Sequence, residues 1–169
     1  TKASLHASRR LAAVAVDPSI MAARNRYGKP VSTLDRDTLV AYLQCRYEVH
    51  ARRPFVLRVG ERSRALAALY ARCGSACAAY LSACNPRGEL VGAERNARAT
   101  RRLQRTIERR GYAWIDGFGR DPDAAWPGEA SVLVPALGLA EATELAGRFA
   151  QNALLWAAAD ARPQLILLR

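Results

Sequence analysis

The segment 92–110 constrains the fold more than any other stretch, because it has the pattern of one long helix with two unlike faces. At about 100° per residue, Leu103 and Ile107 lie on one stripe together with Asn96 and Thr100. A second stripe consists of Arg95, Arg98, Arg102, Arg105 and Arg109. The apolar stripe has to be buried, so we expect it to face a β-sheet and to carry Asn96 inward.

A mostly small and apolar segment, 76–83, comes before this helix. It has no polar alternation, which is typical of a central strand covered on both faces. The turn signal Asn85-Pro86-Arg87-Gly88 follows directly. We therefore expect Asn85 to leave the sheet close to the inward-facing Asn96. A buried amide needs partners, because leaving one unpaired costs on the order of 1–3 kcal/mol.

The remaining segments predict further helices and strands. Ser32 or Thr33 is a suitable N-cap for a short helix over 34–41, and Ser63 caps a second helix that Gly74 ends. Strand patterns occupy 43–59 (a hairpin), 112–115, 130–137 and 153–168 (a closing hairpin), and 139–150 is helical. These patterns predict an α+β single domain over 34–169, with a mixed sheet of six or seven strands and three main helices packed on it. Residues 1–33 are predicted to be a basic N-terminal extension.

The formal net charge of the sequence is +11, and it is unevenly distributed. Residues 91–111 contain seven arginines and two glutamates, residues 1–33 are also basic, and residues 112–169 are mildly acidic. This asymmetry favours an anionic partner, either a nucleic acid or a phosphate-bearing ligand. Genome bias is the competing explanation, because 24 of the 26 basic residues are arginines in an alanine-rich chain.

Four cysteines and two histidines limit the metal and redox chemistry of the chain. Cys73 and Cys77 are spaced C-x3-C, but no second pair or nearby histidine completes a zinc site. We expect free thiols, no metal and no cofactor. No apolar run approaches the roughly 18 residues that span a bilayer, so we expect no membrane partner and a cytoplasmic location. The Arg- and Ser-rich, acid-poor residues 1–30 leave an organelle matrix as the alternative location and suggest a protein partner for that segment.

The order of seven motifs resembles a family of bacterial proteins that is catalogued only as a domain of unknown function. The motifs are Gly60 before a helix, Ala83-Cys84-Asn85-Pro86, Glu94-Arg95-Asn96-Ala97-Arg98, Gly111-Tyr112, Gly117-x-Gly119-x-Asp121-Pro122, Trp126-x-x-Glu129-x-Ser131 and Phe149-Ala150-Gln151-Asn152-Ala153. The likeness covers about residues 42–168. It supports the fold and the location of a site, and it implies no reaction. Four positions depart from the family's usual pattern. The family usually has an aromatic residue at Cys84, Pro at Ala130, Phe at Val132 and Gly at Ala150.

Uncharged amides at the ends of predicted elements are the first candidate binding residues. Asn85, Asn96, Gln151 and Asn152 have the donors and acceptors needed to read the edge of a base or a sugar. The same side chains commonly cap turns and helix ends, which is the structural explanation. Trp126 is suited either to stack on a ligand or to cover the edge of the core.

Arginines and glycines supply the candidate phosphate contacts. Arg98, Arg102 and Arg105 could follow a phosphate backbone, or could form only a solvated helix face. Gly117 and Gly119 could present backbone N–H groups to a phosphate. A single G-x-G is a weak signal, and a turn that uses the conformational freedom of glycine explains it better.

Three functions remain open from the sequence. The leading one is a binding module for an anionic partner, RNA or a nucleotide-like ligand, with the amides giving shape and the arginines giving charge. The second is a small hydrolase or nucleotide-processing enzyme that uses Glu129 with Asp121 or Asp116 as an acid/base pair. The third is a structural subunit that docks through its N-terminal arm.

Overall fold

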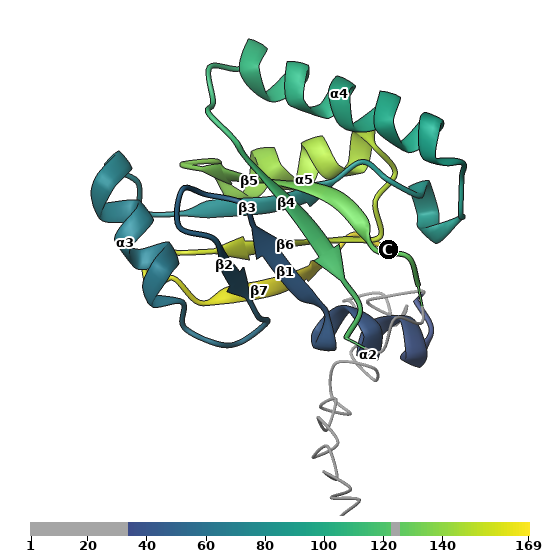
Figure 1. Cartoon of the computed structure of the whole chain (residues 1–169), viewed down its shortest axis with the longest axis horizontal. Helices are drawn as coiled ribbons and strands as arrows, with labels where there is room; N and C mark the ends of the chain where they lie inside the picture. The colour runs from purple at the N-terminus through teal and green to yellow at the C-terminus, as the bar shows by residue number, and fades with distance from the viewer. Residues whose placement is uncertain (1–33, 123–125) are drawn as a thin grey trace, which may run out of the picture.

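The computed structural model describes residues 34–122 and 126–169, which form an α+β single domain built on one seven-stranded sheet (Figure 1). The proposed extension, residues 1–33, lies outside the described residues. The helices are α2 (Arg36–Gln44), α3 (Arg64–Cys73), α4 (Ala93–Arg109) and α5 (Leu139–Arg148), with a short 3-10 helix η1 (Pro86–Gly88). The strands are β1 (Arg46–Val49), β2 (Phe55–Leu57), β3 (Ala78–Ser82), β4 (Ile115–Arg120), β5 (Glu129–Pro135), β6 (Ala153–Ala157) and β7 (Pro163–Leu167). The described part thus has four α-helices, where three main ones were expected.

The strands lie in the order β2-β1-β4-β5-β3-β6-β7, and every neighbouring pair is antiparallel. The expectation of a mixed sheet is therefore wrong. Alternating strands and helices along a sequence suggest parallel crossovers, but here each helical connection returns the chain to a strand that runs against its neighbours. The sheet is curled, and the Gly60 amide after β2 donates to the Pro163 carbonyl at the start of β7 (2.8 Å).

Helices α4 and α5 cover one face of the sheet (Figure 1). Leu103 and Ile107 of α4 and Leu145 of α5 are fully buried in a layer with Val132 and Val134 of β5. The apolar stripe predicted for α4 therefore faces the sheet. Burying each of these side chains stabilises the fold by about 1.5–3 kcal/mol.

The opposite face is the inside of the curl. Leu57 of β2 and Leu165 of β7 come from the two edges of the sheet and contribute to the same apolar cluster. Leu66 of α3 lies in that cluster as well, so α3 fills one end of the curl. Strand β3 lies between the two layers, with Leu81 in one and Tyr80 in the other, which confirms it as a central strand covered on both faces.

Local capping explains where the shorter helices begin and end. The Ser63 hydroxyl accepts from the Leu66 amide, and Gly74 adopts a left-handed conformation after α3, as expected. The N-cap of α2 is Asp35, not Ser32 or Thr33 as expected, because its carboxylate accepts from the Thr38 amide at 2.8 Å. Helix α2 also runs to Gln44, so the strand expected from residue 43 begins at Arg46.

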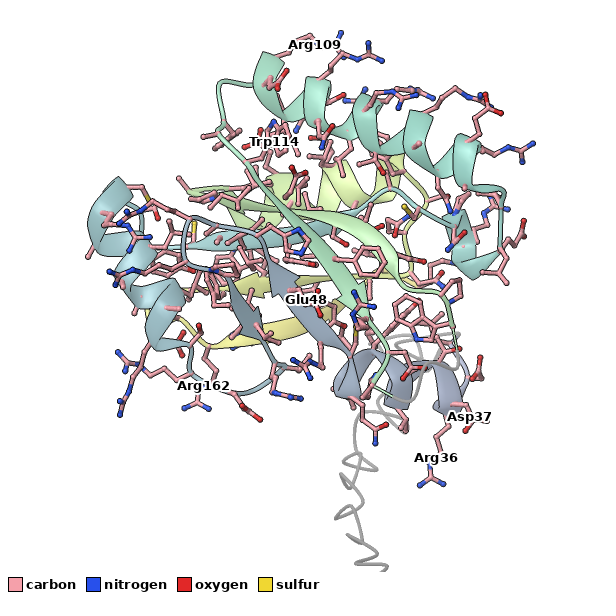
Figure 2. All side chains as sticks on the ribbon, in the orientation of Figure 1. Arg36, Asp37, Glu48, Arg109, Trp114 and Arg162 are labelled. Atoms are coloured by element: carbon pink, nitrogen blue, oxygen red, sulfur yellow. The ribbon has the colours of Figure 1, made fainter. Side chains whose placement is uncertain are left out.

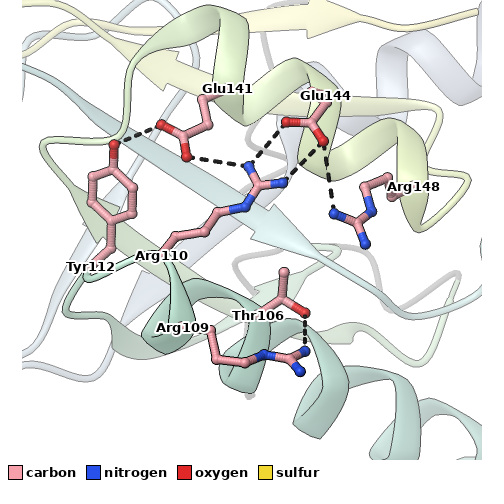
Figure 3. Close-up of polar contacts among 7 residues, drawn as sticks. All are labelled: Thr106, Arg109, Arg110, Tyr112, Glu141, Glu144 and Arg148. Carbon is pink, nitrogen blue, oxygen red and sulfur yellow. Dashed lines mark hydrogen bonds and ion pairs between the residues drawn. The ribbon is translucent and has the colours of Figure 1, made fainter.

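Arg110 joins the end of α4 to α5. Its guanidinium lies 3.2 Å from Glu141 and 3.0 Å from Glu144, and the Tyr112 hydroxyl donates to Glu141 at 2.6 Å (Figure 3). Arg109 bonds only within α4 and points away from the sheet (Figure 2). Arg110 is thus a structural residue, distinct from the exposed stripe that we call the arginine face, namely Arg95, Arg98, Arg102, Arg105 and Arg109.

Candidate functional site

Several loops meet at one end of the curled sheet, opposite α3. Strands β3 and β4 end there, and β1, β5 and β6 begin there. Three residues at this end have left-handed backbones, with φ of 46° at Asn85, 59° at Arg87 and 53° at Ala150. Such conformations cost on the order of 1–3 kcal/mol each in non-glycine residues and cluster at binding and catalytic sites. This end of the sheet is therefore the candidate site.

Asn85 is the centre of a buried hydrogen-bond network. Its backbone amide donates to Oδ1 of Asn96 (2.9 Å), and Nδ2 of Asn96 donates back to Oδ1 of Asn85 (3.0 Å). The same Oδ1 accepts from the Val91 amide (3.1 Å), and Nδ2 of Asn85 donates to Oε1 of Glu129 (2.9 Å). The side chain of Asn85 is thereby fixed, and it fixes the carboxyl of Glu129 in turn.

The turn between α5 and β6 is tied to the same loop. Nε2 of Gln151 donates to the carbonyl of Cys84 (2.9 Å), and the Arg87 amide donates to the carbonyl of Ala150 (2.7 Å). On the side of α2, Nδ2 of Asn152 donates to the Tyr42 hydroxyl (3.3 Å). Segments far apart in the sequence are therefore held together in one rigid polar frame.

A groove of about 570 Å³ opens across this frame. This volume lies within the range of roughly 300–1,000 Å³ that is usual for small-molecule sites. Its walls carry aromatic rings, amides, two guanidinium groups and two carboxyl groups, from Tyr42, Asn85, Arg87, Trp126, Asn152, Arg169, Asp35 and Glu129.

A smaller space of about 60 Å³, the inner cavity, lies inside the end of the curl. Glu129 and Trp126 line both the groove and the inner cavity, so the two spaces adjoin at these residues. The inner cavity has one polar wall, formed by Tyr47, Tyr80, Ser82, Ser131 and Gln151. Its remaining lining is mostly apolar and includes Cys45, Gly119, Ala153, Leu154, Leu155 and Leu165. No arginine lines the inner cavity, whereas Arg87 and Arg169 line the groove.

Glu129 is the carboxyl that lines both spaces at this end of the sheet. Burial raises the pKa of its carboxyl above the ordinary value of 4.5, while hydrogen bonds from Asn85 and Ser82 lower it in part. Among the described residues, no arginine forms an ion pair with this carboxyl. A partly buried carboxylate without a cationic partner retains its capacity to bind a donor or to exchange a proton.

The structure brings together most of the residues that the sequence proposed. Asn85, Trp126, Glu129 and Asn152 line the groove, and Gln151 lines the inner cavity. Asn96 lines neither space and lies behind Asn85, which it holds in place. Of the proposed amides, Asn85 and Asn152 can thus meet a ligand in the groove, and Asn96 acts through Asn85.

The two glycines of the G-x-G motif are not in a turn, and that expectation is wrong. Gly117 and Gly119 lie within β4 and pair with both β1 and β5, so their backbone N–H groups face neighbouring strands and form no phosphate cradle. A Cβ at Gly117 would lie only 2.7 Å from the Tyr80 hydroxyl, so close packing explains this glycine. Gly119 lines the inner cavity, where a Cβ would meet no atom closer than 3.7 Å.

The other proposed residues lie outside the two spaces. Arg98, Arg102 and Arg105 are exposed along α4, and Arg98 pairs with Glu94 at 2.8 Å. Asp121 is buried and has interactions of its own, but it lines neither the groove nor the inner cavity. An additional carboxylate considered as a partner, Asp116, is exposed and accepts from Gln104.

Sequence patterns alone did not indicate Tyr42, Arg87 or Arg169 as site residues. Tyr42 belongs to α2, and Arg169 follows the last strand, so each is far along the chain from 81–129. Arg87 belongs to the turn signal Asn85-Pro86-Arg87-Gly88, and its place there is the one feature of the sequence that points to the site. Residues that join a site only through tertiary contact leave no local pattern.

The described residues contain no group of three His, Cys, Asp or Glu side chains that could hold a metal ion. The four cysteines are free: Cys45 and Cys84 are buried, Cys77 is partly buried and Cys73 is exposed. Burial raises the pKa of the Cys45 thiol to about 12, so this thiol is a poor nucleophile at neutral pH. In the described part of the chain, no helix is both long and apolar enough to cross a bilayer.

The fold and the site together define an α+β protein with a polar groove at one end of an antiparallel sheet. A family described as a protein of unknown function (DUF3293) matches residues 81–154. The matched segment runs from β3 to the start of β6 and contains Asn85, Asn96 and Glu129. This match is consistent with the resemblance to a domain of unknown function, and it supplies no activity. No curated protein and no solved structure matches the chain.

Proposed function

We propose that this protein is a binding module for an anionic, nucleotide-like ligand that occupies the groove. The observation that carries the proposal is the combination of groups around one space of about 570 Å³. Arg87 and Arg169 provide positive charge for a phosphate, and Tyr42 and Trp126 provide aromatic rings for a base. Asn85 and Asn152 add amides that can contact a base or a sugar.

The polar frame supports this function because hydrogen bonds within the protein hold its side chains in position. Asn85 is fixed by Asn96, and Asn152 is fixed between Tyr42 and Arg169, whose Nη1 donates to Oδ1 of Asn152 at 3.4 Å. A site whose side chains are held in position loses less conformational entropy on binding.

The proposal is tested by isothermal titration of the chain with nucleoside monophosphates. We expect micromolar binding that weakens about tenfold or more when Arg87 and Arg169 are both replaced by alanine, because charged hydrogen bonds to phosphate contribute about 1.5–3 kcal/mol each. Arg72→Ala on α3, at the other end of the sheet, is the matched control and should bind like the wild type. No measurable binding of any nucleotide would reject the proposal.

RNA is a polymer of nucleotides and offers the same phosphate, sugar and base groups as a single nucleotide. The arginine face on α4 is exposed and therefore accessible to a phosphate backbone. No aromatic side chains interleave with its arginines, so it would add charge without reading sequence. Its contribution is separable from the groove, because it lines neither space at the site.

A small hydrolase or nucleotide-processing enzyme is the second candidate. It is favoured by the partly buried Glu129 carboxyl, because burial raises its pKa and a raised pKa suits a carboxyl to act as a general acid or base. Asp121, its suggested partner, lines neither space, so Glu129 would act with a ligand group or with water. Nucleotide turnover that disappears in Glu129→Gln, while binding persists, would establish this candidate over a pure binding module.

The third hypothesis, a structural subunit that docks through its N-terminal arm, concerns residues outside the described part. Deleting residues 1–30 and measuring the assembly state by light scattering tests it. An unchanged assembly state would remove it.

A further inference from the structure

We propose that the inner cavity binds the edge of the ligand's base and selects a base with adjacent N–H donors, such as the Watson–Crick edge of guanine. In this arrangement the donors face the Glu129 carboxylate. This inference rests on the proposed nucleotide-binding function and adds a specificity to it. Guanine offers its N1–H and 2-amino group side by side, which matches the two oxygens of a carboxylate. Adenine offers a single amino group beside an acceptor nitrogen.

The polar wall of the inner cavity has acceptors left over and few donors. The hydroxyl of Tyr47 donates to the carbonyl of Tyr42 (2.7 Å), and that of Tyr80 donates to the carbonyl of Glu48 (2.9 Å). These two donor hydrogens are therefore used within the protein, and each hydroxyl oxygen keeps lone pairs that can accept.

The serine and glutamine side chains repeat this pattern. The single hydroxyl hydrogen of Ser82 is shared between the carbonyl of Ala130 (3.1 Å) and the Glu129 carboxyl, and Ser131 Oγ donates to the carbonyl of Glu129 (3.2 Å). Nε2 of Gln151 donates to two carbonyls, at 2.9 and 3.2 Å. Along this wall a ligand group must therefore supply donors of its own. The donor hydrogen of the Tyr42 hydroxyl, which accepts from Asn152, lies where the inner cavity meets the groove.

Glu129 is the strongest acceptor in this wall and is held in one orientation. A carboxylate has about four lone-pair sites, and the described contacts to this carboxyl come from Asn85 and Ser82 only. Because Asn85 is fixed by Asn96, the carboxyl does not have to reorganise when a ligand arrives. Its remaining lone pairs are available to the donors of the ligand.

The sizes and charges of the two spaces determine which end of the ligand enters the inner cavity and which end stays in the groove. The inner cavity, at about 60 Å³, admits an edge of a ring but not a whole nucleotide, which the groove of about 570 Å³ can hold. Arg87 and Arg169 line the groove alone, so a phosphate stays outside while the donor edge points inward. Tyr42 and Trp126 line both spaces and can contact the ring along its length.

The test is a comparison of GMP, IMP and AMP by isothermal titration with the full chain. We expect GMP to bind about tenfold or more tightly than AMP, as a matched bidentate contact provides, and IMP, which lacks the 2-amino group, to fall between them. Glu129→Gln should remove the preference for GMP, because its amide places a donor against the donors of guanine. The glutamine side chain otherwise has the same size and shape as the glutamate side chain.

A second variant tests the cavity without changing Glu129. Gly119→Ala adds a methyl group that meets no atom closer than 3.7 Å, so the fold should persist while the cavity shrinks and the GMP preference falls. Gly147→Ala, exposed on α5 with nothing within 4 Å, is the matched control and should keep the preference. Equal binding of GMP and AMP, or a preference that survives in Glu129→Gln, would overturn the selectivity and leave nucleotide binding intact. No binding of any of the three nucleotides would overturn both proposals.

Discussion

At the scale of single residues, the site depends on two left-handed backbones that are stabilised differently. Asn85 has φ of 46°, and its side chain offsets this conformation by accepting from the Val91 amide nearby. Asparagine tolerates such backbones because its short side chain forms local hydrogen bonds of this kind. Ala150 has φ of 53° and no polar side chain to compensate. Ala150 is thus a strained position.

Ala150→Gly should therefore stabilise the protein. Removing the Cβ relieves about 1–2 kcal/mol of strain, and the added freedom of the unfolded chain offsets about 0.5–1 kcal/mol of it. We expect a net gain of up to about 1.5 kcal/mol in the free energy of unfolding, measured in urea. Ala97→Gly, at an exposed position of α4, is the control and should lose about 1 kcal/mol. A loss of stability in Ala150→Gly as well would show that the strain is absent.

Glu129→Gln should change how stability depends on pH. The pKa of Glu129 is raised in the folded state, so the folded chain holds this proton more tightly than the unfolded chain does. The contribution of the group is therefore complete below its ordinary value of 4.5 and is lost as the pH rises through the folded pKa. Glutamine cannot ionise and keeps an acceptor for Asn85.

The variant should accordingly match the wild type at low pH and exceed its melting temperature at neutral pH. Glu89→Gln, which changes an exposed glutamate near the same loop, should give a pH profile parallel to that of the wild type. If Glu129→Gln also gives a parallel profile across the whole range, burial of the charge is not costly at this position.

At the scale of elements, α4 carries the network that positions the site. Asn96→Ala removes two hydrogen bonds to Asn85 and leaves buried polar groups unpaired. We expect a loss of about 1–3 kcal/mol in the free energy of unfolding together with weaker nucleotide binding, although Asn96 lines neither space. Arg102→Ala on the exposed side of the same helix should stay within about 0.5 kcal/mol of the wild type. Similar losses in both variants would mean that the hydrogen bonds to Asn85 are not responsible, because alanine does not lower helix propensity at either position.

The two faces of α4 could be predicted because a long periodic segment contains all the information needed to place them. Leu103 and Ile107 are buried, Arg102 is exposed, and Asn96 turns inward, as the spacing indicates. The strand β3 and the closing hairpin were predictable for the same local reasons. Hydrophobic periodicity fixes such elements before any tertiary contact forms.

What could not be predicted depends on contacts between distant segments. Gly117 resembles a turn glycine, and only the close approach of Tyr80 and of the Glu48 carbonyl shows why a strand requires it. The direction of each strand depends on its partner, so the antiparallel order could not follow from the local alternation of strands and helices. The curl of the sheet brings Tyr42 and Arg169 to the site. Because the curl depends on all the strands together, no short stretch of sequence predicts it.

At the scale of the whole molecule, the net charge of +11 is divided between structure and surface. Arg110 is used to hold α4 against α5, while the arginine face lies in solvent along the same helix. Arg87 and Arg169 are in a third position, on the walls of the groove. Composition gives only the net charge, to which all three groups of arginines contribute. Genome bias and selection for an anionic partner both predict a high net positive charge. A measurement that depends on where the charges lie can separate the two explanations.

Salt dependence of RNA binding is such a measurement. Replacing Arg98, Arg102 and Arg105 by glutamine removes three charges from the arginine face, and replacing Arg62, Arg64 and Arg72 removes three exposed charges at the α3 end. Each phosphate contact to single-stranded RNA contributes about 0.7 to the slope of log K against log salt concentration. If the arginine face follows the backbone of a longer RNA, the first variant should lose about 2 from this slope, measured by fluorescence anisotropy, and the second should lose little.

The two variants carry the same net charge, so a non-specific effect of charge would lower both slopes equally. That result would assign the arginines to composition and leave the groove as the only nucleotide site. A mononucleotide gives an internal check, because its phosphate contacts Arg87 and Arg169 alone in our proposal. Its affinity should be nearly the same in the wild type and in both triple variants, whatever the RNA measurement shows. A large fall in mononucleotide affinity in the α4 variant would instead place the phosphate on α4 and contradict the proposed orientation in the groove.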